Sequence, residues 1–170
     1  MKKMASLLMV LCFLLVGGTA NAFADEIPTP PLSQISPNPN YASVSWRNPA
    51  FINGNPDGIM GTGQDGLQIT YASAGISKSS SSSIYISVTT ESNIESTEIG
   101  GIIRIQRWIN NSWENYEVHS FWDYITDECS VSTTVGVDSG YYYRLSVTHI
   151  AGTGYSTKTA YSTTGGILVN

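Results

Sequence analysis

The sequence predicts an all-β fold, an antiparallel β-sandwich of eight or nine short strands. Apolar and polar residues alternate with a period of two in most segments, which is typical of half-buried strands. Ser, Thr, Val, Ile and Tyr dominate these segments, and clusters of Gly, Asn, Asp and Ser separate them. No segment repeats apolar residues at helical spacing over three turns.

The N-terminal segment has the pattern of a secretory signal peptide. Lys2 and Lys3 precede an apolar run from Ala5 to Val16 that is too short to span a bilayer comfortably. Small residues then follow at the spacing that signal peptidase requires, and cleavage is expected after Ala22 or Ala24. We therefore expect a secreted, extracellular protein.

Three parts are predicted along the chain. Residues 1–24 are the signal peptide, residues 25–40 a flexible leader and residues 41–170 a single β-sandwich domain. The leader is expected to be extended and unpaired because its prolines lack backbone donors. These prolines are Pro28, Pro30, Pro31, Pro37 and Pro39.

The first strand is predicted from Tyr41 to Trp46. Its apolar residues Ala42, Val44 and Trp46 alternate with Ser43 and Ser45. One face is therefore apolar and the other carries hydroxyls. We expect Trp46 to lie in the core.

Two more strands follow a turn-rich segment at residues 53–66. Leu67, Ile69 and Tyr71 are predicted to share one face of the first of these strands. The second strand alternates Ile84, Ile86 and Val88 with polar residues. The run from Ser79 to Ser83 is too polar to bury, so we interpret it as a mobile loop between the two strands.

The clearest hairpin has a four-residue turn from Ile109 to Ser112, with alternating strands on both sides. Trp108 and Trp113 flank this turn and are expected to face each other. Such facing aromatic pairs contribute roughly 0.2 to 1 kcal/mol, so no ligand is needed to explain them. Phe121 to Asp127 is interpreted as a connection.

The remaining strands are predicted around 129–137, 141–147, 155–161 and 166–169. Residues 138–142 carry the Asp-x-Gly-x-Tyr pattern of an immunoglobulin-type strand. Burying Tyr142 would also bury Arg144, so the apolar parity predicts Tyr143 in the core instead. The sandwich is therefore expected to be immunoglobulin-like or jelly-roll-like.

Several short motifs in the C-terminal half occur together in a recognisable order. They are Ile105-Gln106-Arg107-Trp108, Asn111-Ser112-Trp113, Gly140-Tyr141-Tyr142-Tyr143-Arg144, Thr148-His149 and Tyr161-Ser162-Thr163-Thr164-Gly165-Gly166-Ile167. In this order they resemble an uncharacterised family of small secreted proteins from Gram-positive bacteria (Firmicutes), a domain of unknown function. The resemblance implies a signal peptide and one β-rich domain, and it implies no active-site residues.

The charge balance argues against nucleic acid and anionic membranes as partners. Removing Lys2 and Lys3 with the signal peptide leaves 6 basic against 13 acidic residues, and 6 minus 13 gives a formal charge of −7. The basic residues are scattered, whereas phosphate binding needs clustered Lys and Arg. We expect no nucleic-acid partner and no membrane association after signal removal.

No metal or other cofactor is predicted. Asn53, Asn55 and Asp57 match the first half of a calcium loop, but Gln64 stands where the bidentate Glu belongs. His119 and His149 are the two imidazoles, and their spacing matches no zinc motif. Cys129 is the one thiol outside the signal peptide, and acidic neighbours should raise its pKa, so it is interpreted as a strand residue that fills space.

Four tryptophans and ten tyrosines are the strongest indication of a recognition function. Trp113, Trp122, Tyr142 and Tyr155 are the aromatic residues expected to reach the surface and bind a ligand. The chain lacks a hydrolase elbow motif, so we expect a non-enzymatic binding or surface-interaction module, with an extracellular glycan or protein as partner. The alternatives are a self-associating matrix component, whose strand at Ser130 to Thr134 extends a neighbour's sheet, and third a hydrolase.

Overall fold

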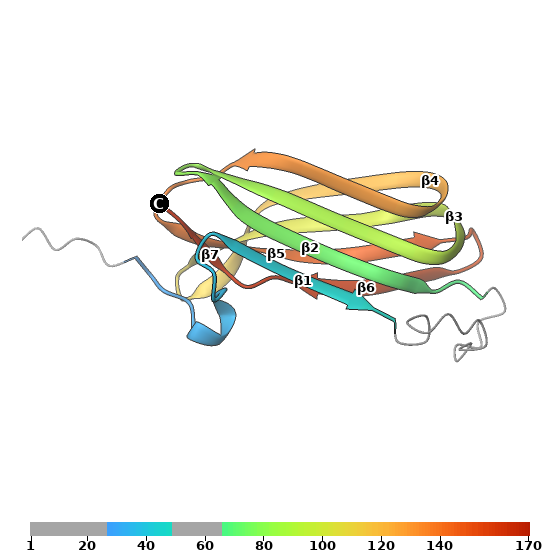
Figure 1. Ribbon diagram of the computed structural model, residues 1–170, viewed down its shortest axis with the longest axis horizontal. Helices are drawn as coiled ribbons and strands as arrows, with labels where there is room; N and C mark the ends of the chain where they lie inside the picture. The colour runs from blue at the N-terminus through green and yellow to red at the C-terminus, as the bar shows by residue number, and fades with distance from the viewer. Residues whose placement is uncertain (1–26, 49–65) are drawn as a thin grey trace, which may run out of the picture.

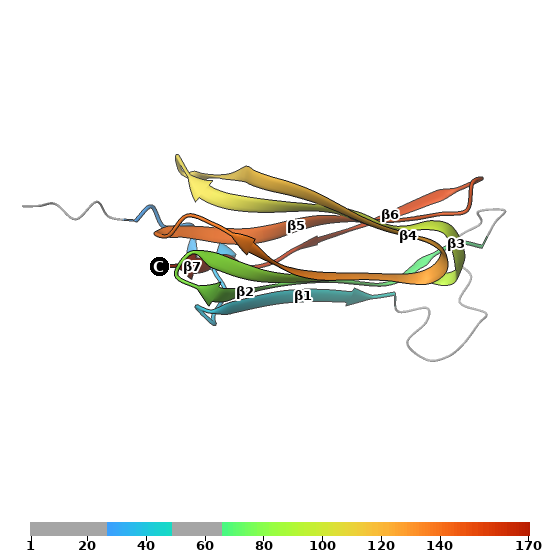
Figure 2. The same ribbon diagram turned by 90° about the horizontal axis from the view of Figure 1, so that it is seen from above.

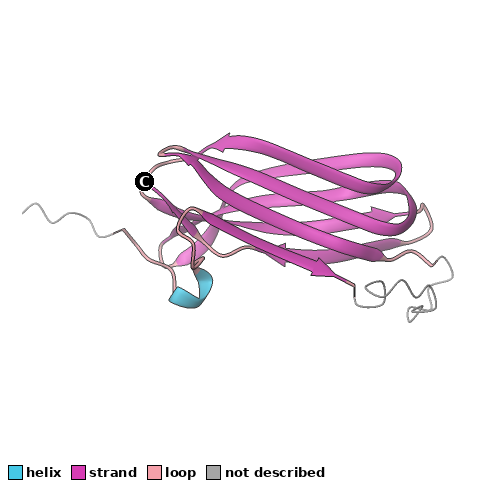
Figure 3. Cartoon of the chain, viewed as in Figure 1, coloured by secondary structure: helices cyan, strands magenta, loops and turns pink. Residues whose placement is uncertain are grey.

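The computed structural model describes residues 27–48 and 66–170 of the chain. The predicted signal peptide and the calcium-like loop from Asn53 to Gln64 therefore lie outside the described residues. In the described part, seven strands form one antiparallel network, which confirms the all-β prediction (Figures 1 and 3). The elements are η1 (Leu32–Gln34), β1 (Tyr41–Arg47), β2 (Ile69–Ser80), β3 (Ser83–Ile109), β4 (Ser112–Gly136), β5 (Tyr141–Gly152), β6 (Thr157–Thr163) and β7 (Ile167–Val169).

Two layers arise because the long strands β3 and β4 pass from one to the other. The first part of β3, residues 83–92, pairs with β2, and the last part, residues 98–107, pairs with β5. β4 stays paired with β3 in both parts. Figure 2 shows both strands curling at one end of the molecule, with β1 and β2 in one layer and β5 and β6 in the other. The sandwich prediction is confirmed, with seven described strands instead of eight or nine.

Polar side chains hold the curl in place. The strand register shifts between Glu91 and Ser96, and on β4 the residue next to the partner of Ser96, Ile125, has a positive φ of 55°. Buried Ser92 donates to the carbonyl of Ile94 at 2.8 Å and lies 3.0 Å from the Ser96 hydroxyl. The turned backbone is therefore satisfied by local hydroxyls, as buried polar groups require. The segment Phe121 to Asp127, which the sequence predicted to be a connection, is strand because it pairs across this curl.

A second set of contacts ties the curl to the start of β2. Asn93 Nδ2 donates to the carbonyl of Gly66 at 2.8 Å, and Asn93 Oδ1 accepts from the amide of Gln68 at 2.7 Å. The Asn93 amide donates to the Gln68 carbonyl at 3.1 Å. One side chain and its own backbone thus fix the approach of the chain to β2.

The core between the layers follows the predicted alternation. Ile84, Ile86 and Val88 are buried in the first layer, and Leu145 and Val147 in the second. Burial of each such side chain contributes about 1.5 to 3 kcal/mol. The prediction for Tyr143 is confirmed, since its ring is 0% exposed. Its hydroxyl donates to the carbonyl of Asp138 at 3.0 Å, which satisfies the phenol at the margin of the core.

Three local predictions were wrong, each because the outcome depends on how the strands pair. Trp46 is 43% exposed because β1 is the edge strand of its layer. A register shift between Ile69 and Tyr71 turns the Tyr71 side chain out of the face that buries Leu67 and Ile69. The run from Ser79 to Ser83 is a tight hairpin turn, since Ser80 pairs with Ser83.

The hairpin at the Trp pair forms as predicted. Trp108 pairs with Trp113 in register, and their rings meet edge to face with centroids 5.3 Å apart. The turn itself places Asn110 and Asn111 at positive φ, 52° and 61°. Asn tolerates this conformation, which suits a two-residue turn between twisted strands.

A buried histidine links the two layers. His149 of β5 is 0% exposed, and its Nδ1 lies 2.8 Å from Thr90 Oγ1 of β3. Thr90 donates its own proton to the Gly100 carbonyl at 3.1 Å, so it accepts from Nδ1–H. Nε2 then accepts from Ser162 Oγ of β6 at 3.0 Å. Burial lowers the pKa of His149 to about 4, so the neutral ring is the native form.

This histidine predicts an acid-sensitive fold. Its pKa rises from about 4 in the fold to 6.5 when unfolded, so the unfolded chain binds more protons between these values. The contribution to stability is complete above pH 6.5 and decreases as the pH falls toward 4, by about 3 kcal/mol in all. Urea unfolding from pH 4 to 7 should show a steeper pH dependence for the native protein than for His149→Asn. Equal slopes for the two proteins would contradict the assignment.

Cys129 is predicted to be inert in the native state. The thiol is 3% exposed, and burial, followed by the charge of Asp123 and then of Glu128, raises its pKa to about 11. A pKa two units above the usual 9.0 leaves about a hundredfold less thiolate at neutral pH. Iodoacetamide should therefore label Cys129 only after unfolding in urea. Rapid labelling of the native protein would show that the strand opens locally.

Candidate functional site

The outer face of the layer formed by β1, β2, β3 and the end of β4 is an array of small hydroxyl residues. Side chains at directly paired positions lie on the same face of a sheet. One row therefore runs across the four strands as Ser43, Gly75, Ser87 and Ser132, and the next as Ser45, Ser73, Thr89 and Ser130. Alternation alone produces this face, because the residues between them fill the core.

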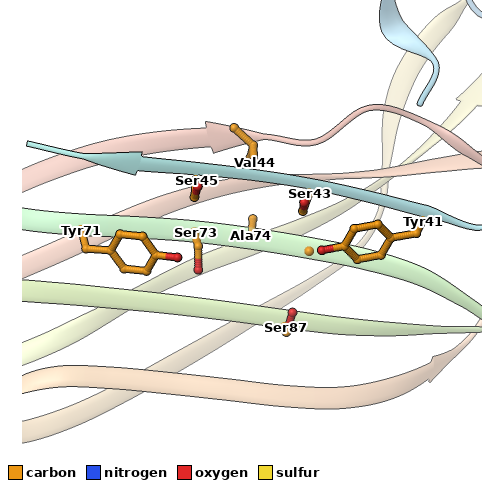
Figure 4. Close-up of a pocket in the computed structure, with 9 residues that line it drawn as sticks. Tyr41, Ser43, Val44, Ser45, Tyr71, Ser73, Ala74 and Ser87 are labelled. Atoms are coloured by element: carbon orange, nitrogen blue, oxygen red, sulfur yellow. The ribbon is translucent and has the colours of Figure 1, made fainter. Parts of the chain in front are cut away.

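A shallow hollow of about 210 Å³ lies in this array. It is lined by Tyr41, Ser43, Val44, Ser45, Tyr71, Ser73, Ala74, Gly75 and Ser87. Figure 4 shows Tyr41 and Tyr71 at its two ends with their hydroxyls directed toward each other, and the serines between them. The hollow is therefore bounded by two phenols and lined by hydroxyls.

Gly75 creates the depth of the hollow. A Cβ at this position would lie 2.9 Å from Ser87 Oγ and 3.9 Å from the Tyr41 hydroxyl. Any other residue would thus occupy the space between the two side chains. Glycine weakens a strand, so its presence here marks a place that must stay open.

The polar groups of the hollow are unpaired within the described chain. None of the hydroxyls of Tyr41, Tyr71 and the four lining serines makes a hydrogen bond to another described residue. By contrast, Ser130 on the same face donates to Thr89 Oγ1 at 3.0 Å. Each unpaired hydroxyl can donate one hydrogen bond and accept two.

The electrostatic character of the hollow is close to neutral. Its lining contains no carboxylate, imidazole, thiol or ammonium group. A cation lies beside one end of the lining, since the Arg47 guanidinium carbon is 4.7 Å from the centre of the Tyr71 ring. This contact orients the ring. The lining residues include no nucleophile paired with a base.

The predicted ligand residue Trp113 has a structural task. Its Nε1 donates to Gln34 Oε1 at 2.6 Å, and the Arg144 guanidinium carbon lies 4.4 Å above its ring. A Cβ on Gly166 would approach the ring to 2.8 Å, so the indole is closely enclosed. Trp113 thereby anchors the leader segment near η1. The same segment also pairs with Gly166 through a β-bridge at Ile35.

The other three predicted ligand residues lie on three different segments of the chain. Trp122 projects from the outer face of the second layer and is 36% exposed, whereas Tyr142 is partly buried opposite Leu168. Tyr155 is 98% exposed in the turn between β5 and β6. Trp113 and Trp122 stand nine positions apart on β4, about 30 Å along a strand. Trp113 and Trp122 therefore do not share one site, and none of the four residues lines the hollow.

The hollow was missed at the sequence level, although its signal was present. The hydroxyl face of residues 41–46 was recognised, but not its continuation across β2. Tyr71 and Ser73 flank the same surface only after the register shift turns them outward. A Ser and Gly alternation bracketed by two tyrosines is the pattern that would have indicated it.

The described residues form neither a metal-ligand cluster nor a membrane-spanning helix. Within 27–48 and 66–170, no three His, Cys, Asp or Glu side chains gather in a way that could hold a metal ion. No helix in these ranges is long and apolar enough to cross a membrane.

Comparison with known proteins provides no identification. No protein-family model matches the chain, and no curated protein matches its sequence. The resemblance to a secreted Firmicutes family therefore stays a prediction.

The anchoring of the leader predicts a measurable loss of stability. Gln34→Ala removes the acceptor of the partly buried Trp113 indole, which should cost about 1 kcal/mol. Ser33→Ala is the matched control, because its side chain is exposed and makes no hydrogen bond. Urea unfolding followed by tryptophan fluorescence measures both variants. Equal stabilities would show that the indole bond contributes nothing.

Proposed function

We propose that the protein is an extracellular, non-enzymatic binding module that recognises a neutral saccharide in the Tyr41–Tyr71 hollow. The observation that carries the proposal is the set of unpaired hydroxyls between two phenol rings. Pyranose rings present hydroxyls at their edges and C–H groups on their faces. Serine hydroxyls complement the edges, and tyrosine offers both an apolar ring and a polar tip.

The size of the hollow favours a single ring. Pockets for drug-sized ligands have volumes of about 300 to 1,000 Å³, whereas this hollow has about 210 Å³. From the hollow, the array of serines and threonines continues over β3 and β4. One sugar ring would occupy the hollow, and further units of a chain would extend over the hydroxyl face.

The charge of the chain favours a neutral ligand. Its formal charge is −5, and the lining of the hollow contributes no cation. A uronic acid or sulfated sugar would be repelled by the overall field. Arg47, which lies beside the hollow, is engaged with the Tyr71 ring.

The predicted secretion supports this proposal, since an exported protein meets extracellular glycans. A hydrolase receives no support from the hollow, because its lining lacks a pair of carboxylates. Of the two predicted classes of partner, glycan and protein, the proposal thus selects a neutral glycan.

The test is a titration of the purified protein with neutral oligosaccharides of glucose, galactose, mannose and N-acetylglucosamine. Binding of at least one of them should be detected by calorimetry and should shift the NMR signals of Ser73 and Gly75. Tyr41→Ala and Tyr71→Ala should each weaken it about tenfold or more, because each removes one wall of the site. Gly75→Val should abolish it by filling the hollow.

Tyr85→Ala is the matched control. Tyr85 lies on the same outer face at 42% exposure, opposite Ser77, but does not line the hollow. This variant should bind as tightly as the native protein. Equal losses for Tyr85→Ala and Tyr41→Ala, or no binding to any sugar at millimolar concentration, would overturn the proposal.

A further inference from the structure

β4 forms an edge of both layers. Its 25 residues, Ser112–Gly136, pair with β3 along one side, and no described strand pairs with the other side. An exposed strand edge presents unpaired N–H and C=O groups that can bind another strand. A long edge of this kind either carries protective features or serves as an interface.

The first half of this edge is protected. A register shift between Ile105 and Gln106 disturbs the pairing opposite Tyr116. Glu117 and His119 then face the inner side of the sheet, with Oε1 and Nε2 3.1 Å apart. Bulges and inward-pointing ionisable residues are the devices by which natural sheets prevent edge pairing. β6 has the same kind of protection, since Lys158 is paired with buried Ala151.

The second half of the edge has no such feature. Residues 129–136, Cys-Ser-Val-Ser-Thr-Thr-Val-Gly, carry no charge and no proline. Ser130, Ser132, Thr133 and Thr134 are exposed, and the register with β3 is regular from Glu128 to Gly136. High β-propensity without charge is the composition of a strand that pairs readily.

The direction of the backbone groups follows from one hydrogen bond. The amide of Val137 donates to the carbonyl of Ser82 at 2.9 Å, toward β3. In a regular antiparallel strand alternate residues point their backbone groups to opposite sides. Ser130, Ser132, Thr134 and Gly136 therefore direct their N–H and C=O groups to the free edge.

We propose that two copies of the protein associate through this edge, with antiparallel β4 strands related by a two-fold axis at Ser132. In this register Ser132 faces its equivalent, Ser130 faces Thr134 of the second copy, and Glu128 faces Gly136. All N–H and C=O groups that residues 128 to 136 direct to the free edge would then form hydrogen bonds with the second copy. Ser132 is at the centre of that series, which makes the interface self-complementary.

Charge favours the antiparallel orientation, because no two acidic residues then lie directly opposite each other. Asp127 and Glu128 precede the uncharged segment, and Asp138 follows it. In the antiparallel pair Asp127 and Glu128 of one copy lie opposite Val137 and Gly136 of the other, and Asp138 lies opposite Thr126 and diagonal to Glu128. A parallel pair in the same register would set Glu128 against Glu128, and like charges directly opposite are destabilising.

The pairing joins two four-stranded layers into one continuous sheet. Directly opposed residues of antiparallel strands share a face, so both hydroxyl arrays lie on the same side of this sheet. The proposal does not depend on saccharide binding. If both hold, the dimer presents two hollows to one polymer and gains avidity from them.

The test is sedimentation equilibrium of the purified protein over a concentration series at physiological salt. The native protein should show a reversible monomer–dimer equilibrium. Ser132→Pro removes an edge-directed N–H without touching the bonds to β3, so it should be monomeric, with the thermal stability that the native protein has at concentrations where it is monomeric. Thr159→Pro is the matched control, because Thr159 has the same edge-directed parity on β6 and should leave the dimer intact.

Two charge variants identify the occupant. Ser132→Lys and Ser132→Glu should each be monomeric alone, because like charges would meet at the axis. An equimolar mixture should form a mixed dimer, which no interface with a different protein would produce. A native protein that is monomeric at every concentration, a dimer that survives Ser132→Pro, or a mixture that stays monomeric would overturn the proposal.

Discussion

The curl of the β3–β4 hairpin is the constraint on which the rest of the structure depends. Because both strands pass from one layer to the other, β2 and β5 can each pair with a different part of β3. The two layers are therefore covalently continuous at one end and are held at a fixed offset. The hydroxyls of Ser92 and Ser96 and the Asn93 amide satisfy the turned backbone, so the curl is specified by side chains as well as by packing.

A second connection between the two layers, the hydrogen bonds of buried His149, lies at the same end of the sandwich. His149 in β5 reaches Thr90 in the first-layer part of β3, and Ser162 of β6 completes its hydrogen bonds. A buried polar group is tolerated only when its partners are placed correctly, so this network favours one relative position of the layers. At the opposite end, Trp113 performs a comparable task for the leader segment. Two aromatic side chains that could have been interpreted as ligand contacts are thus parts of the scaffold.

The two outer faces of the sandwich differ although both come from the same alternation. In the first layer the outward positions are mostly Ser, Thr and Gly, which leaves a low, hydroxylated surface in which Tyr41 and Tyr71 stand out. In the second layer the outward positions include Trp122 and Tyr161. The two faces therefore present different chemistry to solvent, small hydroxyl side chains on the first layer and large aromatic rings on the second.

The sequence alone was enough to predict most of the core-facing residues, because side-chain direction alternates locally within a strand and needs no knowledge of the neighbours. Ile84, Ile86, Val88, Leu145 and Tyr143 were predicted in this way and are buried. It also determined the Trp108–Trp113 hairpin, whose partners lie close along the chain. Only the tertiary structure decided which strands are edges, where the register shifts and which outward side chains meet. The exposure of Trp46, the outward turn of Tyr71 and the hollow that Tyr71 forms with Tyr41 all depend on strand pairings over long sequence distances, and such pairings are set by the energy of the whole assembled sheet.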